Sequence, residues 1–377
     1  MDRVLGQSQA VDLLNLQLTT GRQHHAYIFH GPVGVGKFTT ALAYARILLC
    51  HARTPDPAGR VTDCGACESC KLLSNLSTPD IDASEDDDTL GLTTAHPDLH
   101  VIRKELARYS DDKKTRDRKL TRIPVEVLRS ALIEPANLAA NLAGGKVFIV
   151  DEAELLNPAG QNALLKTLEE PPDGTTLILV TGNEDRLLPT IRSRCMRIAF
   201  SPLPDKAIGD WCDQHAPDLP DAQRRTLVEF ASGSLGRAQL ITRYGLLAWA
   251  DTVLPALDRA ARGEPTAGLG QQIFSFIDSF ANGFVKAHAN ASKEAANKLA
   301  ADLMWSLIAT RARRRLAELA EQCAPDDPTA NQAALRPWLT MIDATRQAQK
   351  LLASNVNLSM TCDHFAVTMT RGLAPSY

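Results

Sequence analysis

One run of residues in this sequence is suited to holding phosphate. Glycines recur over Gly31–Lys37, directly after the apolar run 26–30 and before a helical pattern. Glycine lets the backbone wrap closely around an anion, while backbone amides and a helix start present positive charge to it. A lysine that ends such a loop reaches the terminal phosphates of a nucleotide. The run predicts a phosphate-binding loop, and a glycine-rich turn without a ligand is the alternative; the candidate contacts are Gly31, Gly34, Gly36 and Lys37.

The residue after this lysine departs from the phosphate-loop pattern. The pattern has serine or threonine there, whose hydroxyl binds Mg²⁺, whereas this chain has Phe38 followed by Thr39. A phenyl ring offers no metal ligand, and Thr39 points elsewhere because a helix turns about 100° per residue. Thr39 stays a candidate nucleotide contact. We nevertheless expect ATP, ADP and Mg²⁺ to bind weakly or not at all, and hydrolysis at this site to be poor.

Polar residues follow two further strand-like runs. Asp151 and Glu152 follow the run 146–150, where the first acid can hold Mg²⁺ and the second can activate water. A structural remnant or a cap for the next helix is the alternative reading of this pair. Thr181 and Asn183 follow the run 176–180 and either sense a γ-phosphate or form a turn.

Arg194 is the candidate for action outside the chain's own site. It lies in the segment 190–195, between Ser193 and Cys195. An arginine fixed on a surface can reach a neighbouring subunit's nucleotide and stabilise phosphoryl transfer there. The alternative is an ordinary surface salt bridge.

Four cysteines have the spacing of a metal site. Cys64, Cys67 and Cys70 form two overlapping CxxC pairs, and Cys50 precedes them at the end of a predicted helix. Four thiolates match the tetrahedral ligand set of structural zinc and leave no open position for catalysis. A reactive CxxC redox pair and an iron–sulfur cluster are the alternatives.

The elements that must position these residues indicate an α/β fold with a parallel sheet. Between the third and fourth of its strand-like runs, a helix is predicted from Asn157, which caps it, to Pro171, which ends it, with Leu164, Leu165 and Leu168 facing the core. The strand-like runs are 26–30, 99–102, 146–150, 176–180 and 196–200.

Length and composition restrict the class of protein. A chain of 377 residues is longer than one hydrophobic core usually accommodates, so more than one domain is expected. A composition of 44% apolar and 23% charged residues is typical of globular proteins. A net charge of −3 excludes a polybasic nucleic-acid binder. No apolar run approaches the roughly 20 residues that span a bilayer, and the first residues lack a signal-peptide core. We therefore expect a cytoplasmic protein without membrane contact.

Three domains are predicted. The α/β core covers residues 1–201 with the cysteine module at 50–70, a small helical domain covers 202–245, and an all-helical domain covers 246–377. An acidic segment at 80–88 and a basic one at 103–122 interrupt the core. The basic segment is either a solvated face or a nucleic-acid contact, and the acidic one has no assigned role.

Together these motifs resemble the clamp-loader AAA+ family of bacterial DNA polymerase III. The resemblance covers about residues 1–240. It is carried by Leu5–Gln7, His25–Phe29, Gly31–Lys37, the four cysteines, Asp151–Glu154, Asn162–Pro172, Ser193–Cys195 and Gly233–Ala238. It implies an AAA+ core, a helical lid and a helical collar that assembles a hetero-pentamer with gamma/tau and delta subunits, which places a sliding clamp on primed DNA.

Within this family the residues resemble the stator class, which donates the arginine of its Ser-Arg-Cys segment, here Arg194, to a neighbour's ATP site. Phe38 favours that class, as does the lid, where Gly236 stands in place of the usual arginine. Arg237 follows one position later and is a candidate nucleotide contact. Lys37 and the acidic pair favour the alternative, an ATP-hydrolysing gamma/tau-like motor subunit. A second alternative is a zinc-dependent DNA-binding module on a degenerate AAA+ scaffold.

Overall fold

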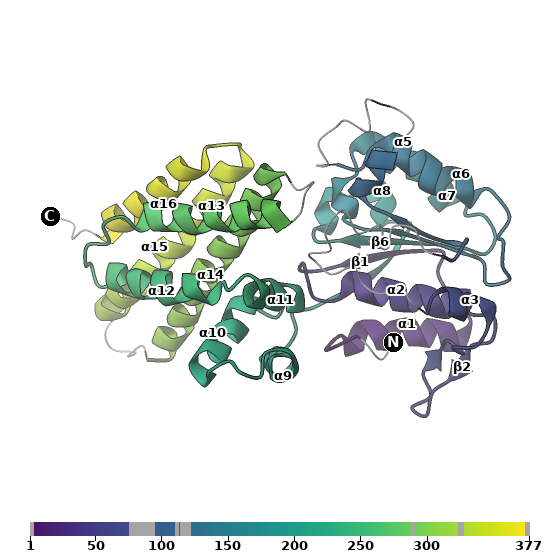
Figure 1. The fold of residues 1–377 in the computed structure, drawn as a ribbon, viewed down its shortest axis with the longest axis horizontal. Helices are drawn as coiled ribbons and strands as arrows, with labels where there is room; N and C mark the ends of the chain where they lie inside the picture. The colour runs from purple at the N-terminus through teal and green to yellow at the C-terminus, as the bar shows by residue number, and fades with distance from the viewer. Residues whose placement is uncertain are drawn as a thin grey trace. The chain divides into compact units, whose positions relative to one another are not determined.

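The computed structural model describes residues 4–74, 95–109, 113, 122–287, 292–322 and 328–373. The acidic segment 80–88 and most of the basic segment 103–122 lie outside these residues. The described chain divides into two compact units (Figure 1). The first contains 4–74, 95–109, 113, 122–207 and 234–236, and the second contains the rest. The division into three domains stays a prediction.

A five-stranded parallel sheet in the order β4-β5-β6-β1-β7 forms the centre of the first unit (Figure 1). Helices cover both of its faces, which explains the near-continuous apolar runs of its strands. All five predicted strands are confirmed, and the fourth is one residue longer at each end. Their bounds are β1 Ala26–His30, β4 Leu99–Ile102, β5 Lys146–Val150, β6 Thr175–Thr181 and β7 Met196–Ala199.

Two apolar cores lie on opposite faces of this sheet. Tyr27, Phe29 and Tyr44 belong to the core under α1 and α2, and Phe148 and Leu164 belong to the core under α5 to α8 (Figure 1). Each strand therefore buries alternate side chains on alternate faces. The helical bounds are α1 Ser8–Thr20, α2 Lys37–Leu49, α3 Glu68–Leu72, η1 Lys104–Tyr109, α5 Val125–Leu128, η2 Arg129–Ile133, α6 Glu134–Ala136, η3 Ala153–Leu155, α7 Pro158–Glu169, η4 Glu184–Arg186 and α8 Pro189–Arg192; a small hairpin pairs β2 Thr54–Pro55 with β3 Val61–Thr62.

The register of the sheet brings distant residues to one edge. Ile102, the last residue of β4, pairs with Val150, the last of β5, and Val150 in turn pairs with Leu179 of β6. The phosphate loop follows β1 at the same edge, since parallel strands end on the same side. This arrangement brings the candidate nucleotide contacts that follow β1, β5 and β6 to the same edge of the sheet.

Helix α7 begins and ends as predicted. The side chain of Asn157 accepts a hydrogen bond from the Gly160 amide at 2.7 Å, which satisfies one of the free donors at the helix start. Leu164 and Leu168 are buried against the sheet. The helix holds Glu169 at its other end, a residue that contacts the candidate arginine described below.

The second unit is helical throughout the residues described, which confirms the predicted all-helical C-terminal region. Helices α13 to α16 pack against one another, with Trp305 against Phe365 at 5.2 Å between ring centres. Within the described residues, no helix has the length and apolarity needed to cross a membrane. Two helices, α9 and α11, begin in the first unit. The bounds are α9 Asp205–His215, α10 Asp221–Ala231, α11 Leu235–Arg243, α12 Leu247–Ala261, α13 Leu269–Ala287, α14 Lys293–Gln322, α15 Pro328–Ala353 and α16 Leu358–Leu373.

The Asn157 cap gives a first prediction. Asn157→Ala leaves the Gly160 amide without its acceptor and lowers the free energy of unfolding by about 1 kcal/mol. The midpoint of the urea transition of the first unit measures this loss. Asn157→Asp, which keeps an acceptor oxygen, is the matched control and retains stability. Equal losses in both variants would contradict the capping role.

Candidate functional site

The phosphate loop forms the predicted turn between β1 and α2. Gly36 has φ 97° and Gly31 has φ 139°, and residues with a side chain rarely adopt these backbone conformations. A Cβ at Gly31 would also lie 2.1 Å from the Phe200 carbonyl oxygen. Lys37 begins α2, and its Nζ donates to the carbonyls of Gly31, at 2.7 Å, and Pro32. The loop therefore curls around the lysine.

Other segments of the first unit fix the loop from outside. The Gln7 side chain donates to the carbonyls of Val35 at 3.1 Å and of Ser201 at 2.7 Å. The Gly236 amide donates to the Gly34 carbonyl at 3.1 Å. Gln7 belongs to a motif that the sequence showed without assigning it a role, and Gly236 belongs to the lid motif.

Lys37 is a buried cation. Its residue is 6% exposed, and burial lowers the pKa of its ammonium to about 8, although Glu154 and Asp151 act in the opposite direction. A cation that is poorly solvated gains more than an exposed one from a nearby anion. The lysine is therefore suited to a phosphate group.

The residues around the phosphate loop do not offer the set of oxygen ligands that Mg²⁺ requires. The guanidinium of Arg103 lies over the Phe38 ring, 4.2 Å from its centre, and Arg103 Nη2 lies 2.8 Å from Asp151 Oδ2. The hydroxyl of Thr40 donates to the Gly36 carbonyl at 2.8 Å. The acid expected to hold the metal already has a cationic partner, and Phe38 supplies no ligand where the pattern has a hydroxyl.

The second acid of the pair also has a cationic partner. Lys104 Nζ lies 2.7 Å from Glu152 Oε2, and Glu152 has φ 49°, a left-handed conformation that costs a non-glycine residue energy. Arg103 and Lys104 belong to the basic segment for which a solvated face or a nucleic-acid contact was expected. The sequence reasoning missed both contacts, because the only signal was their place directly after a strand.

The residues after β6 are held by backbone contacts. The Thr181 hydroxyl accepts from the Asn183 amide at 3.0 Å, and the Asn183 side chain accepts from the Asp185 amide at 3.0 Å. The Gly182 amide donates to Glu154 Oε1 at 3.0 Å. These contacts form a turn, one of the two readings of the segment, and the role of Thr181 and Asn183 as γ-phosphate contacts stays a prediction, as does that of Thr39.

Arg194 lies at the surface in a defined orientation. Its side chain is 36% exposed, and Nη2 lies 2.8 Å from Glu169 Oε1 at the end of α7. Nη1 donates to the Thr190 carbonyl at 3.0 Å. An exposed ion pair of this kind contributes about 1 kcal/mol or less, so another anion can replace the carboxylate at small cost.

Arg237 belongs to the second unit. Its Nη1 donates to the Ser306 hydroxyl at 2.7 Å. Its role as a nucleotide contact stays a prediction.

The four cysteines come together as their spacing predicts. Cys50 follows α2 directly. Cys64 lies before the short helix α3, Cys67 is the residue directly before that helix, and Cys70 lies within it. The sulfurs lie within 4.8 Å of one another, including 3.9 Å for Cys64–Cys70 and 4.0 Å for Cys50–Cys67. A tetrahedral zinc with bonds of about 2.3 Å requires sulfurs about 3.8 Å apart. The donor set is therefore consistent with zinc.

A buried serine attaches this module to the sheet. Ser69 is fully buried, and its hydroxyl lies 3.0 Å from His51 Nε2 and 2.9 Å from His96 Nε2. The Asp98 amide donates to His96 Nδ1, so His96 carries its proton on Nε2 and donates to Ser69. Ser69 can then donate to His51. Sequence reasoning missed this chain, which no spacing pattern reveals.

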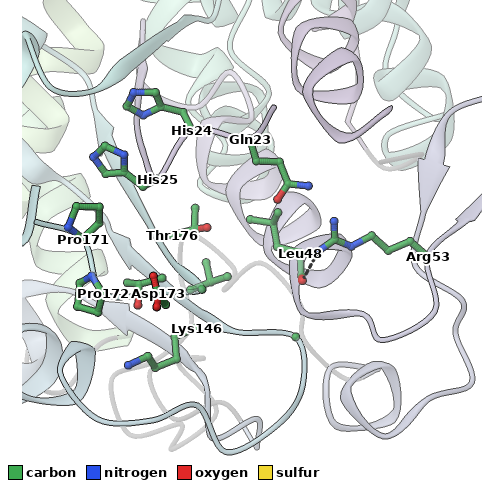
Figure 2. A pocket seen from close by; sticks show the side chains of 14 residues that line it. Gln23, His24, His25, Leu48, Arg53, Lys146, Pro171, Pro172, Asp173 and Thr176 are labelled. Atoms are coloured by element: carbon green, nitrogen blue, oxygen red, sulfur yellow. Dashed lines mark hydrogen bonds between the residues drawn. The ribbon is translucent and has the colours of Figure 1, made fainter. Parts of the chain in front are cut away.

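A cavity of about 380 Å³ opens at the amino-terminal ends of the strands, away from the phosphate loop (Figure 2). Three of its basic side chains contact carbonyls at helix ends. His25 donates to the Leu168 carbonyl at 3.0 Å, Arg53 to that of Leu48 at 2.8 Å, and Lys146 to carbonyls at the end of α6. Of these three side chains, Arg53 and Lys146 are the cations that offset the negative ends of helices, because burial lowers the pKa of the His25 ring.

Fold and site together define a parallel-sheet α/β protein with a phosphate loop whose own metal-ligand set is incomplete. The family model described as "DNA polymerase III, delta subunit" matches residues 6–204, more than half of the chain. The chain belongs to this family.

Relatives include two named classes of subunit. The DNA polymerase III subunit delta' of Pseudomonas aeruginosa is 34% identical over 61% of this chain and 60% of that protein. The gamma/tau subunit of Mycobacterium bovis is 33% identical over 61% of this chain and 34% of that protein. The chain thus aligns with less than two thirds of either relative. A solved gamma subunit-related protein of Thermotoga maritima is 15% identical, with a TM-score of 0.41 over 96% of this chain and 99% of that one.

The cysteine cluster predicts that the purified protein contains one metal ion per chain. Cys67→Ser removes one of four ligands, so bound metal falls from one ion per chain to near zero and the melting temperature falls with it. Elemental analysis of the purified protein measures the first effect and calorimetry the second. Cys195→Ser, outside the cluster, is the control and keeps the metal. Stoichiometric metal in Cys67→Ser would refute the four-thiolate site.

The buried lysine predicts a pH dependence. Folded Lys37 loses its proton near pH 8, whereas an unfolded lysine does so near 10.5. At Lys37 the unfolded state thus binds more protons between these values, so this residue contributes a rise in the free energy of unfolding with pH there, on the order of 3 kcal/mol in total. The buried thiols of Cys195 and Cys362, whose pKa burial raises to about 12, contribute in the opposite direction. Urea denaturation at pH 7.5, 8.5 and 9.5 measures the rise. Lys37→Met removes the contribution of the lysine, so wild type minus variant gives the rise, and an identical pH dependence in both proteins would contradict the assignment.

Proposed function

We propose that this chain is the delta'-type stator of a bacterial DNA polymerase III clamp loader, an AAA+ subunit that supplies Arg194 in trans to a neighbouring ATPase subunit. Its partners are gamma/tau and delta subunits in a hetero-pentamer, which loads the sliding clamp on primed DNA. Membership of the family and the similarity to delta' proteins support the class of subunit.

The orientation of Arg194 is the observation that carries this proposal. The guanidinium is held by Glu169 and by the Thr190 carbonyl, and it remains partly exposed. A phosphoryl group in transfer carries more charge than one carboxylate, and its oxygens suit the planar guanidinium. Arg194 is therefore positioned in advance, yet held weakly enough to exchange partners.

The chain's own site supports the same division of labour. Asp151 and Glu152, candidates for metal binding and water activation, are paired with Arg103 and Lys104. A residue committed to an ion pair neither binds a metal freely nor accepts a proton readily. The proposal therefore assigns this chain no turnover of its own and treats the acidic pair as vestigial.

We further propose that the ion held by the four cysteines is zinc and that its role is structural. Four thiolates complete its coordination, so no position is left for water or substrate. The metal joins the end of α2 to α3 and, through Ser69, to the sheet.

A motor subunit of the gamma/tau type is the second candidate, because Lys37 lies in the loop as the pattern requires and the gamma/tau subunit of Mycobacterium bovis is 33% identical over 61% of this chain. It requires magnesium-dependent turnover by the isolated chain that disappears in Lys37→Ala. The stator proposal requires the isolated chain to be inactive.

The test of the finger uses the reconstituted loader. Arg194→Ala lowers ATP turnover at the interface it faces by about 10³-fold or more, the contribution typical of arginine fingers. Folding and assembly remain intact, because a partly exposed ion pair adds little stability. Steady-state ATPase with primed DNA measures the effect.

Arg192→Ala is the matched control. Arg192 also lies at the end of α8 and pairs with an exposed acid, Asp185, at 2.8 Å. Its loss leaves ATPase unchanged. If Arg194→Ala behaved like Arg192→Ala in an intact complex, the finger assignment would be wrong.

A further inference from the structure

The strands β4 and β5 place a cation beside Asp151, the acid that the sequence predicted as a metal ligand. Ile102 pairs with Val150, and the Asp151 amide continues this ladder by donating to the Ile102 carbonyl at 3.0 Å. The register of the two strands therefore makes Arg103 and Asp151 neighbours at the edge of the sheet. Their proximity does not depend on the rotamer of an exposed side chain. Their side chains are only 15% and 19% exposed.

Phe38 completes the arrangement from the other side. It is the second residue of α2, where a hydroxyl would ligate the metal, and it packs against the core under that helix. The Arg103 guanidinium lies 4.2 Å from its ring centre, within the range of a cation–π interaction. The substitution that removes a metal ligand thus supplies a surface for a cation.

We propose that Arg103 is the resident cation of this phosphate loop, held between the Asp151 carboxylate and the Phe38 ring in the position where Mg²⁺ binds in such loops. The arginine excludes the metal in two ways: it takes the charge of Asp151, and it fills the space over Phe38. Any nucleoside phosphate that enters the loop does so without its divalent ion and meets Lys37 and the loop amides only.

This inference concerns the chain's own loop and stands apart from the action of Arg194. A loop that needed Mg²⁺ would leave the finger assignment intact, and an inactive finger would leave the resident arginine intact. The experiment below therefore uses the isolated full-length chain.

The proposal is tested by restoring the metal site. In the double variant Phe38→Thr/Arg103→Ala, a hydroxyl returns and Asp151 loses its partner. Affinity for a fluorescent ADP analogue is measured with 5 mM Mg²⁺ and with EDTA. Wild type shows the same affinity, or the same lack of binding, in both conditions. The double variant binds at least about tenfold more tightly with Mg²⁺.

A matched control separates the arginine from general loosening of the site. Phe38→Thr/Lys104→Ala carries the same hydroxyl and removes the neighbouring cation, which pairs with Glu152 and not with Asp151. It keeps Arg103 and gains no magnesium dependence. Equal gains in the two double variants would overturn the assignment to Arg103.

A second readout needs no nucleotide and covers the case in which the double variant is destabilised. Added Mg²⁺ raises the melting temperature of Phe38→Thr/Arg103→Ala, because a ligand that binds only the folded state stabilises it. The wild-type melting temperature does not respond. The proposal fails if wild type gains tenfold in nucleotide affinity with Mg²⁺ in a manner abolished by Lys37→Ala. It also fails if the double variant responds to Mg²⁺ in neither assay.

Discussion

A carboxylate buried at the end of a strand needs a cation or hydrogen-bond donors beside it. In this protein that carboxylate belongs to Asp151, which follows the fully buried strand β5. Burial raises its pKa even though Arg103 lies beside it and acts to lower that pKa. In a phosphate loop that hydrolyses ATP, the cation arrives with the nucleotide as Mg²⁺. Here the chain supplies it, and most features of the site follow from that substitution.

The two arginines of the first unit have opposite fates because their burial differs. Removing one partner from a buried ion pair costs about 3–5 kcal/mol, whereas an exposed pair contributes about 1 kcal/mol or less. Arg103, 15% exposed, therefore stays in place, and Arg194, 36% exposed, can exchange its partner. The action in trans proposed for Arg194 requires an arginine that can exchange its partner in this way.

Much of this architecture could be predicted from the sequence because its signals are local. β-Branched or apolar runs marked every strand, Asn157 marked the start of α7, and the cysteine spacing predicted a cluster of four thiols. The pair of Arg103 and Asp151 was not predictable in this way, because only the register of β4 against β5 makes neighbours of residues 48 positions apart. The pair of Glu169 and Arg194 was not predictable either, because only the fold brings these two residues together. A charge run and a helix terminus gave no indication of the partner that the fold would provide.

The most direct test of the account is a structure of the reconstituted loader with ADP and beryllium fluoride, which imitates the phosphoryl group in its bound state. The account predicts that the Arg194 guanidinium leaves Glu169 and hydrogen-bonds the fluoride in the neighbouring subunit, while Arg103 still contacts Asp151 and the loop of this chain holds no magnesium. Magnesium-bound nucleotide in this chain's own loop, with Arg103 displaced and Arg194 still on Glu169, would contradict it.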